Sequence, residues 1–216
     1  MRKSVLLIGP GSTDGLGMEI SKLFGSRGFK ILTLSRNINK LEDFKETLGK
    51  DSIENEYWIA DCRDAETVDS VINKMIQNHN IKLVIFNVSS RKSDSILDIS
   101  SKNLIDSLEI NSTSLLNFIR PLLDHLQANK GAIITTGGGL GIKPDWQKAS
   151  LSLDKATLRL ITLLLAEQLY TKEIFVGTIT ISATIKNDSP SDPRKIAKLY
   201  EQMFLKREKN ELIFSI

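Results

Sequence analysis

The chain has 216 residues, of which 41% are hydrophobic and 25% are charged. These proportions are typical of a globular protein of about one domain, and they exclude disordered, collagen-like and coiled-coil chains. The net charge of +3 arises from 29 basic and 26 acidic residues spread along the chain, which does not indicate a nucleic-acid-binding protein. We therefore expect one domain over residues 1–216 that binds no nucleic acid.

The sequence also predicts a cytoplasmic protein with no membrane span and no metal site. No apolar run reaches the length of about 18 to 20 residues that a span requires. The first apolar run is broken by Gly9-Pro10-Gly11 and has no cleavage site of a signal peptide. Cys62 is the only cysteine, which excludes an intrachain disulfide. Neither histidine has further ligands at metal-binding spacing.

Apolar runs of strand length alternate with amphipathic segments of helix length along the whole chain. The predicted strands cover residues 5–8, 30–34, 57–60, 83–86, 132–135, 175–181 and 212–216. Shorter amphipathic stripes lie between the first four runs, and longer helices are predicted at about 101–127, 148–170 and 193–209. Strands that are apolar throughout and alternate with helices predict a doubly wound α/β fold, in which helices cover both faces of a parallel sheet.

Polar and glycine residues mark several expected helix ends. Asn37 and Asp64 precede amphipathic stripes and are predicted N-caps. Gly49 follows the stripe that begins near Leu41, and we expect it to terminate that helix.

A glycine-rich loop follows the first predicted strand and opens an amphipathic helix. Its residues include Gly11, Ser12, Gly15, Leu16 and Gly17. Glycines allow the backbone to approach a phosphate closely, and the start of a helix attracts an anion. Such turns also occur without a ligand, but this one lies at the strand edge where open α/β sheets bind nucleotides. We therefore predict a nucleotide-binding loop.

The loop and several later residues together resemble the short-chain dehydrogenase/reductase family. The further matches, in chain order, are Asp61 after the third strand, Asn87 after the fourth, Asn111 in the long fourth helix and Lys155-Ala156 in the fifth. The resemblance implies a Rossmann-type fold of about seven strands and an oxidoreductase with a nicotinamide cofactor. It assigns the pyrophosphate to the glycine loop, adenine to Asp61, the ribose region to Asn87 and the nicotinamide ribose to Lys155. Pro10 departs from the threonine that is usual in the family.

The end of the second strand distinguishes between the two nicotinamide dinucleotides. Family members that prefer NAD place an acid there, whereas this chain has Ser35-Arg36-Asn37. A guanidinium at this point favours the 2′-phosphate of NADP(H). The alternative is that Arg36 is a solvated surface charge.

The catalytic pattern of the family is incomplete in this sequence. The resemblance makes Asn111 and Lys155 catalytic residues, and it places the proton-donating tyrosine at Leu151 and the serine at Gly138. No tyrosine lies near Lys155, so a shifted alignment does not restore the acid. Loss of a positioned general acid costs about 10²- to 10⁴-fold in rate.

The serine position is less well fixed by the alignment. Thr135 and Thr136 lie just upstream of it, and Ser150 and Ser152 flank the tyrosine position.

We therefore predict an NADP(H)-binding oxidoreductase-like protein with impaired or non-standard activity. Three alternatives remain at this stage: an enzyme that uses another acid or none, a dinucleotide sensor or partner subunit without activity, and a scaffold that binds nothing. The helix over 148–170 is leucine-rich on more than one face. By resemblance to the family, a homodimer or homotetramer through the two long helices is expected.

Overall fold

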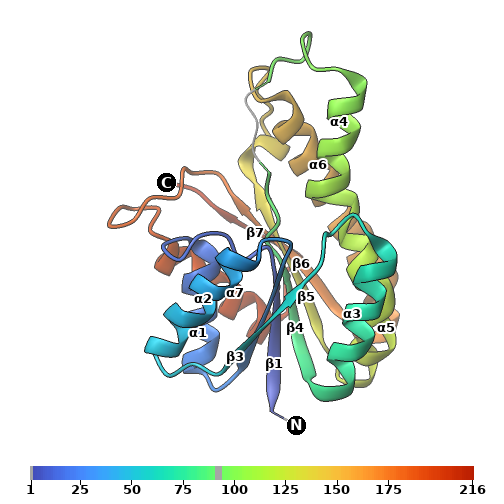
Figure 1. Ribbon diagram of the computed structural model, residues 1–216. Helices are drawn as coiled ribbons and strands as arrows, with labels where there is room; N and C mark the ends of the chain where they lie inside the picture. The colour runs from blue at the N-terminus through green and yellow to red at the C-terminus, as the bar shows by residue number, and fades with distance from the viewer. Residues whose placement is uncertain (1, 91–93) are drawn as a thin grey trace.

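Seven strands form one parallel sheet in the computed structural model, which describes residues 2–90 and 94–216. The strands are β1 (Lys3–Ile8), β2 (Lys30–Ser35), β3 (Asn55–Ile59), β4 (Asn80–Phe86), β5 (Ala132–Gly138), β6 (Phe175–Ile181) and β7 (Glu211–Phe214). Their order is β3-β2-β1-β4-β5-β6-β7, and every neighbouring pair is parallel (Figure 1). The predicted doubly wound α/β fold is confirmed.

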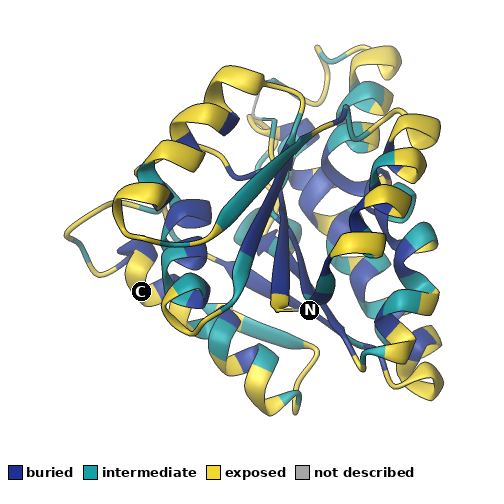
Figure 2. Ribbon diagram, turned by 60° about the horizontal axis from the view of Figure 1, so that its bottom comes forward, coloured by how far each residue is buried: buried dark blue, intermediate teal, exposed yellow. Residues whose placement is uncertain are grey.

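Helices cover the two faces of the sheet, as the alternating pattern predicts. One face carries α1 (Leu16–Ser26), α2 (Ile38–Lys50) and α7 (Pro193–Lys206), and the other carries α3 (Ala65–Asn78), α5 (Leu115–Ala128) and α6 (Ala149–Leu169). Successive side chains of β1 enter opposite cores: Leu6 packs on the side of α3, α5 and α6, and Leu7 packs on the side of α1, α2 and α7. Figure 2 shows the central strands buried and the outer surfaces of the helices exposed.

The expected helix over 101–127 is not continuous. It consists of α4 (Ser101–Leu108), a π-helical turn at Glu109–Thr113 and then α5. The π-turn carries Asn111 and Ser112, which are both fully buried and hydrogen-bonded to Asp154 of α6. Apolar periodicity alone does not predict this π-turn, because hydrogen bonds with another helix, α6, hold it in place.

Most of the other predicted boundaries hold to within three residues. The side chains of Asn37 and Asp64 accept hydrogen bonds from backbone N–H groups in the first turns of α2 and α3, which confirms both N-caps. Gly49 does not terminate α2, because the helix continues through it to Lys50. The last helix ends at Lys206 rather than 209, because Arg207 adopts a left-handed conformation with φ of 53°.

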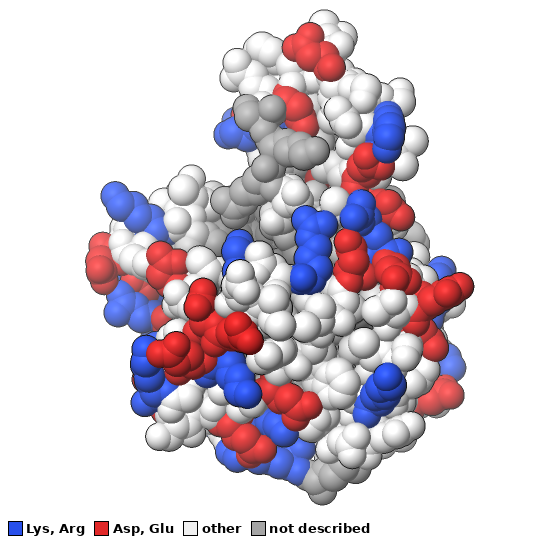
Figure 3. All heavy atoms as spheres, in the orientation of Figure 1, with Lys and Arg blue, Asp and Glu red and all other residues white. Residues whose placement is uncertain are grey.

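Acidic and basic side chains are mixed over the face of the molecule shown in Figure 3. Oppositely charged side chains form ion pairs in the structure, such as Arg2 with Glu54 at 2.6 Å and Lys30 with Glu56 at 3.0 Å. Within residues 2–90 and 94–216, no helix has both the length and the apolarity to cross a membrane.

Candidate functional site

A cavity of about 300 Å³ lies at the carboxyl ends of the first four strands. The chain runs from β1 to β2 and β3 on one side and then returns to β4 on the other side of β1. In open α/β sheets, ligands bind where the strand order reverses in this way. The cavity is lined by the loop after β1, the ends of β2 and β3, and the segment after β4.

The glycine loop brings its backbone close to this cavity. Gly9 and Gly11 have φ values of +75° and +79°, a region that favours glycine. A Cβ atom at Gly17 would lie 2.1 Å from the carbonyl oxygen of Pro10, so the first turn of α1 packs directly on the loop backbone. No side chain caps α1 at Gly15. The positive end of the helix dipole therefore adjoins the loop and suits an anion.

Five of the predicted cofactor-binding residues line the cavity: Gly11, Ser35, Arg36, Asp61 and Asn87. The others in the loop, from Ser12 to Gly17, continue from the cavity wall into α1. Lys40 also lines the cavity, although it was not among the predicted cofactor-binding residues. Its spacing was a usable signal, because Lys40 follows Arg36 by four residues at the start of a helix capped by Asn37.

Three charged side chains meet at the adenine end predicted for the site. The guanidinium of Arg63 donates two hydrogen bonds to the Asp61 carboxylate, at 3.2 and 2.9 Å, and Arg36 pairs with the same carboxylate at 3.5 Å. The Arg63 hydrogen bonds hold the pKa of Asp61 well below its usual range. The Arg36 side chain is 63% exposed, so its guanidinium has room to engage a further anion.

Asn87 connects three strands behind the glycine loop. Its Nδ2 donates to the carbonyl oxygen of Gly9 at 2.8 Å, and its Oδ1 accepts from the hydroxyl of Thr136 at 2.9 Å. The phenol of Tyr200 lies 2.7 Å from that hydroxyl. Because Thr136 gives its single hydroxyl proton to Asn87, Tyr200 is the donor to Thr136. Asn87 thus helps to fix the loop backbone, and a buried tyrosine of α7 completes the chain.

Asn111, predicted to be catalytic, is fully buried and engaged by the protein. Its Nδ2 lies 2.7 Å from Asp154 Oδ2, 3.1 Å from the Ser90 carbonyl and 3.2 Å from Ser107 Oγ. Its Oδ1 accepts from the Ser90 N–H at 2.6 Å. Burial raises the pKa of Asp154, whose other carboxylate oxygen has no partner among the described residues. This hydrogen bond between Asn111 and Asp154 was not predicted from the sequence.

Lys155 lies across the end of β5. Its Nζ donates to the carbonyl oxygen of Thr136 at 2.9 Å, and the side chain is largely buried. A Cβ atom at Gly138 would be 3.2 Å from Lys155 Cγ, so the missing side chain leaves room for the lysine stem.

Neighbouring glycines are also packed closely. A Cβ atom at Gly139 would meet Ser182, and one at Gly141 would meet the α6 backbone. Close packing against β6 and α6 therefore accounts for this second glycine run.

The hydroxyls considered as substitutes for the serine all have partners within the protein. Thr135 bonds Thr162 in the core at 2.9 Å, and Ser150 bonds the Asp94 carboxylate. Ser152 donates to the Lys148 carbonyl at 2.9 Å. These contacts stabilise the start of α6 and its packing on β5.

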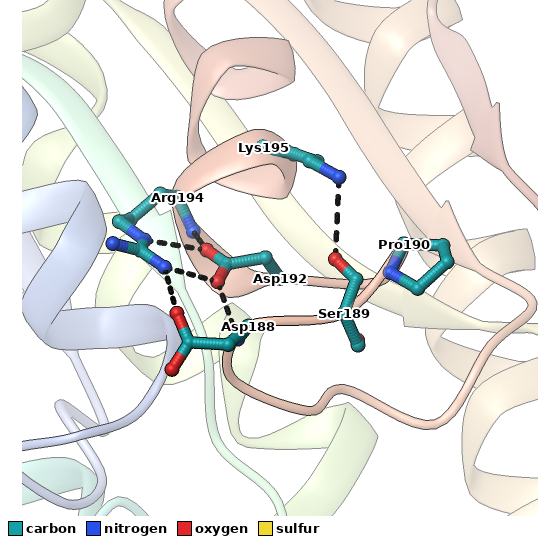
Figure 4. Close-up of a pocket in the computed structure, with 6 residues that line it drawn as sticks. All are labelled: Asp188, Ser189, Pro190, Asp192, Arg194 and Lys195. Carbon is teal, nitrogen blue, oxygen red and sulfur yellow. Dashed lines mark hydrogen bonds and ion pairs between the residues drawn. The ribbon is translucent and has the colours of Figure 1, made fainter.

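A second, more open hollow lies in the loop before α7 (Figure 4). Its charged groups already pair with one another, because Arg194 contacts Asp188 at 2.7 Å and Asp192 at 2.6 Å. Lys195 donates to the Ser189 carbonyl at 3.2 Å. These bonds close the loop on the start of α7. In the part of the chain that the structure describes, no three His, Cys, Asp or Glu residues form a group that could hold a metal ion.

Comparison with known proteins shows similarity over most of the chain. The chain is 26% identical over 173 residues to the human protein "Inactive hydroxysteroid dehydrogenase-like protein 1", covering 78% of this chain and 52% of that protein. It thus spans about half the length of the curated relatives that it matches.

Two solved structures have the same fold. A short-chain dehydrogenase from Rhodopseudomonas palustris superposes with a TM-score of 0.85 at 22% identity, covering 99% of this chain and 98% of that chain. An NADPH-bound short chain oxidoreductase from Pseudomonas aeruginosa PAO1, described as containing an atypical catalytic center, gives 0.87 at 13% identity, covering 99% and 95%.

The sequence pattern of the family described as short chain dehydrogenase matches residues 3–188, which span the glycine loop, β1 to β6 and α6. With this match and the sheet order above, the chain belongs to the short-chain dehydrogenase family.

Proposed function

We propose that the protein binds NADP(H) in the cavity between the glycine loop and the ends of β2 and β3. The observation that carries this proposal is that two cations, Arg36 and Lys40, both line the cavity, and that the end of β2 has no carboxylate to bind ribose hydroxyls. Two cations suit the 2′-phosphate that distinguishes NADP(H) from NAD(H). The NADPH-bound structural neighbour supports the same choice.

The geometry of the cavity supports a proposal for the remaining contacts. The loop from Gly11 to Gly17 and the start of α1 hold the pyrophosphate. Asp61 faces the adenine end, and Asn87 keeps the loop in shape while lining the ribose region. A bound nicotinamide would supply or accept a hydride.

Ordinary carbonyl reduction is not part of this proposal. Position 151 carries a leucine, and position 138 carries a glycine whose space is taken by the Lys155 stem. Neither side chain can donate a proton to a carbonyl oxygen. A curated relative named as inactive supports this part of the proposal. The protein therefore acts as an oxidoreductase-family member with impaired or non-standard chemistry, or as a dinucleotide-binding partner subunit.

The binding test is calorimetric titration with NADPH and NADH. We expect micromolar binding of NADPH, weaker binding of NADH, and a loss of about tenfold in NADPH affinity in Arg36→Ala and in Lys40→Ala. Lys45→Ala is the matched control, because Lys45 lies on the same helix but does not line the cavity. Failure of both dinucleotides to bind, or an equal loss in the control, contradicts the proposal.

Turnover is tested separately with NADPH and a panel of ketones and aldehydes. We expect no rate above background with ordinary carbonyls. Rates typical of reductases, of about 1 s⁻¹ or more, would contradict this part.

We also propose that α6 mediates self-association. Its outer face carries Leu153, Leu160 and Leu164, which are 38%, 59% and 56% exposed. A helix that is buried on one side and apolar on the other fits a homodimer interface.

A further inference from the structure

The groups that could bind a dinucleotide are unevenly distributed along the site. At the adenine end, Arg36 and Lys40 line the cavity, and the Arg36 guanidinium is mostly exposed. Their charges adjoin the carboxylate of Asp61, which Arg63 holds in place through two hydrogen bonds. This end therefore presents two cations, Arg36 and Lys40, to an incoming phosphate.

At the other end, the polar groups bind the protein itself. Lys155 Nζ donates to the Thr136 carbonyl, and the stem of Lys155 fills the space above Gly138. Movement of Nζ to a ribose hydroxyl would break the 2.9 Å bond to Thr136 in a largely buried place. Exchange of one hydrogen bond for another yields little net binding free energy.

The side-chain amide of Asn111 likewise forms its hydrogen bonds within the protein. Both of its polar atoms are used, by Asp154 and Ser107 from neighbouring helices and by the backbone of Ser90. The Asn111 side chain is fully buried. It stabilises the packing of α4, the π-turn and α6, and it has no exposed atom with which to contact a cofactor.

We infer that the site recognises the 2′-phosphoadenosine diphosphate half of its ligand and gains little affinity from whatever is attached beyond the diphosphate. This inference rests on the proposed binding of NADP(H), and it specifies which half of that molecule the protein selects. The ligand class is therefore adenosine diphosphates that carry a 2′-phosphate, with or without a nicotinamide riboside.

The experiment compares NADPH with 2′-phospho-ADP, which lacks the nicotinamide riboside, by calorimetry on the full chain. We expect the two dissociation constants to agree to within about fivefold, a difference of about 1 kcal/mol or less. Lys40→Ala should weaken both ligands by the same factor. Lys155→Met, which retains the apolar stem, should leave the ratio of the two constants unchanged.

Two results would overturn the inference: NADPH binding more than about fivefold tighter than 2′-phospho-ADP, or a loss in Lys155→Met that is confined to NADPH. Thermal unfolding of Lys155→Met is measured alongside, and Lys155→Arg provides a second variant that keeps the charge if the first does not fold. If neither ligand binds the wild-type protein, the proposed function itself has failed. If NADPH alone binds, only this inference has failed.

Discussion

The hydroxyl of Tyr200 is predicted to stabilise the fold through one buried hydrogen bond. Tyr200 is 0% exposed, and its oxygen donates to Thr136 at 2.7 Å. Tyr200→Phe removes the hydroxyl and keeps the ring, so no large cavity forms. The variant should lose about 1 kcal/mol of unfolding free energy, which corresponds to about 2–4 °C in Tm for a chain of this length.

The same geometry predicts non-additive behaviour with Thr136. Thr136→Val preserves the shape but leaves the Tyr200 hydroxyl buried without an acceptor, which costs about 1–3 kcal/mol. In that background, Tyr200→Phe should recover part of the lost stability, because it removes the unpaired hydroxyl, whereas Asn87 Oδ1 still lacks the donor that Thr136 supplied. Urea unfolding of the wild type, the two single variants and the double variant measures this double-mutant cycle. If the two losses simply add, the two hydroxyls are not coupled and the predicted hydrogen bond makes no contribution.

Three further predictions test other parts of the structure. Gly17→Ala should abolish NADPH binding in calorimetry, because the added methyl group collides with the loop backbone, and normal binding by this variant would refute this account of the loop. Gly49→Ala is the contrasting variant, because its Cβ atom would meet nothing within 4 Å, and it should stabilise the protein by about 0.5–1 kcal/mol. Burial lowers the pKa of His125, whose neutral Nε2 accepts a backbone N–H at 3.0 Å. The unfolded chain therefore binds the proton more readily than the folded one, and the free energy of unfolding should fall as the pH drops below about 6.5. Urea unfolding at pH 7.5 and 5.5 should show a smaller acid loss in His125→Gln than in the wild type, and equal losses would contradict this assignment. Light scattering should show that the wild-type protein is an oligomer and that Leu160→Glu converts it to a monomer. Leu205→Glu is the control, because Leu205 is exposed on α7, away from the proposed interface, and this variant should remain an oligomer. A monomeric wild type would refute self-association.

The sequence was sufficient for features that depend on local patterns. The seven strands, the glycine loop and the N-caps at Asn37 and Asp64 follow from periodicity and from residue types with strong local preferences. The family resemblance also located the residues that surround the cavity, such as Arg36 and Asn87.

Contacts between distant segments were beyond the reach of local patterns. The π-turn depends on Asp154, which lies 43 positions from Asn111 in the sequence. Tyr200 reaches Thr136 across 64 positions, and no spacing rule connects them. Gly49 failed as a helix terminator because a glycine inside a helix carries only a modest penalty, of about 1 kcal/mol, that neighbouring packing can offset.

The close fit of Lys155 over Gly138 links positions 138 and 151 in any attempt to build a carbonyl-reducing site into this chain. A serine at 138 would place its Cβ atom 3.2 Å from Lys155 Cγ, a tight contact that the lysine stem would have to relieve by a small shift. A hydroxyl there would gain a catalytic use only if a tyrosine also replaced Leu151. The serine alone would therefore bring a packing cost without a catalytic gain, and a reductase site of the family type would need substitution at both positions.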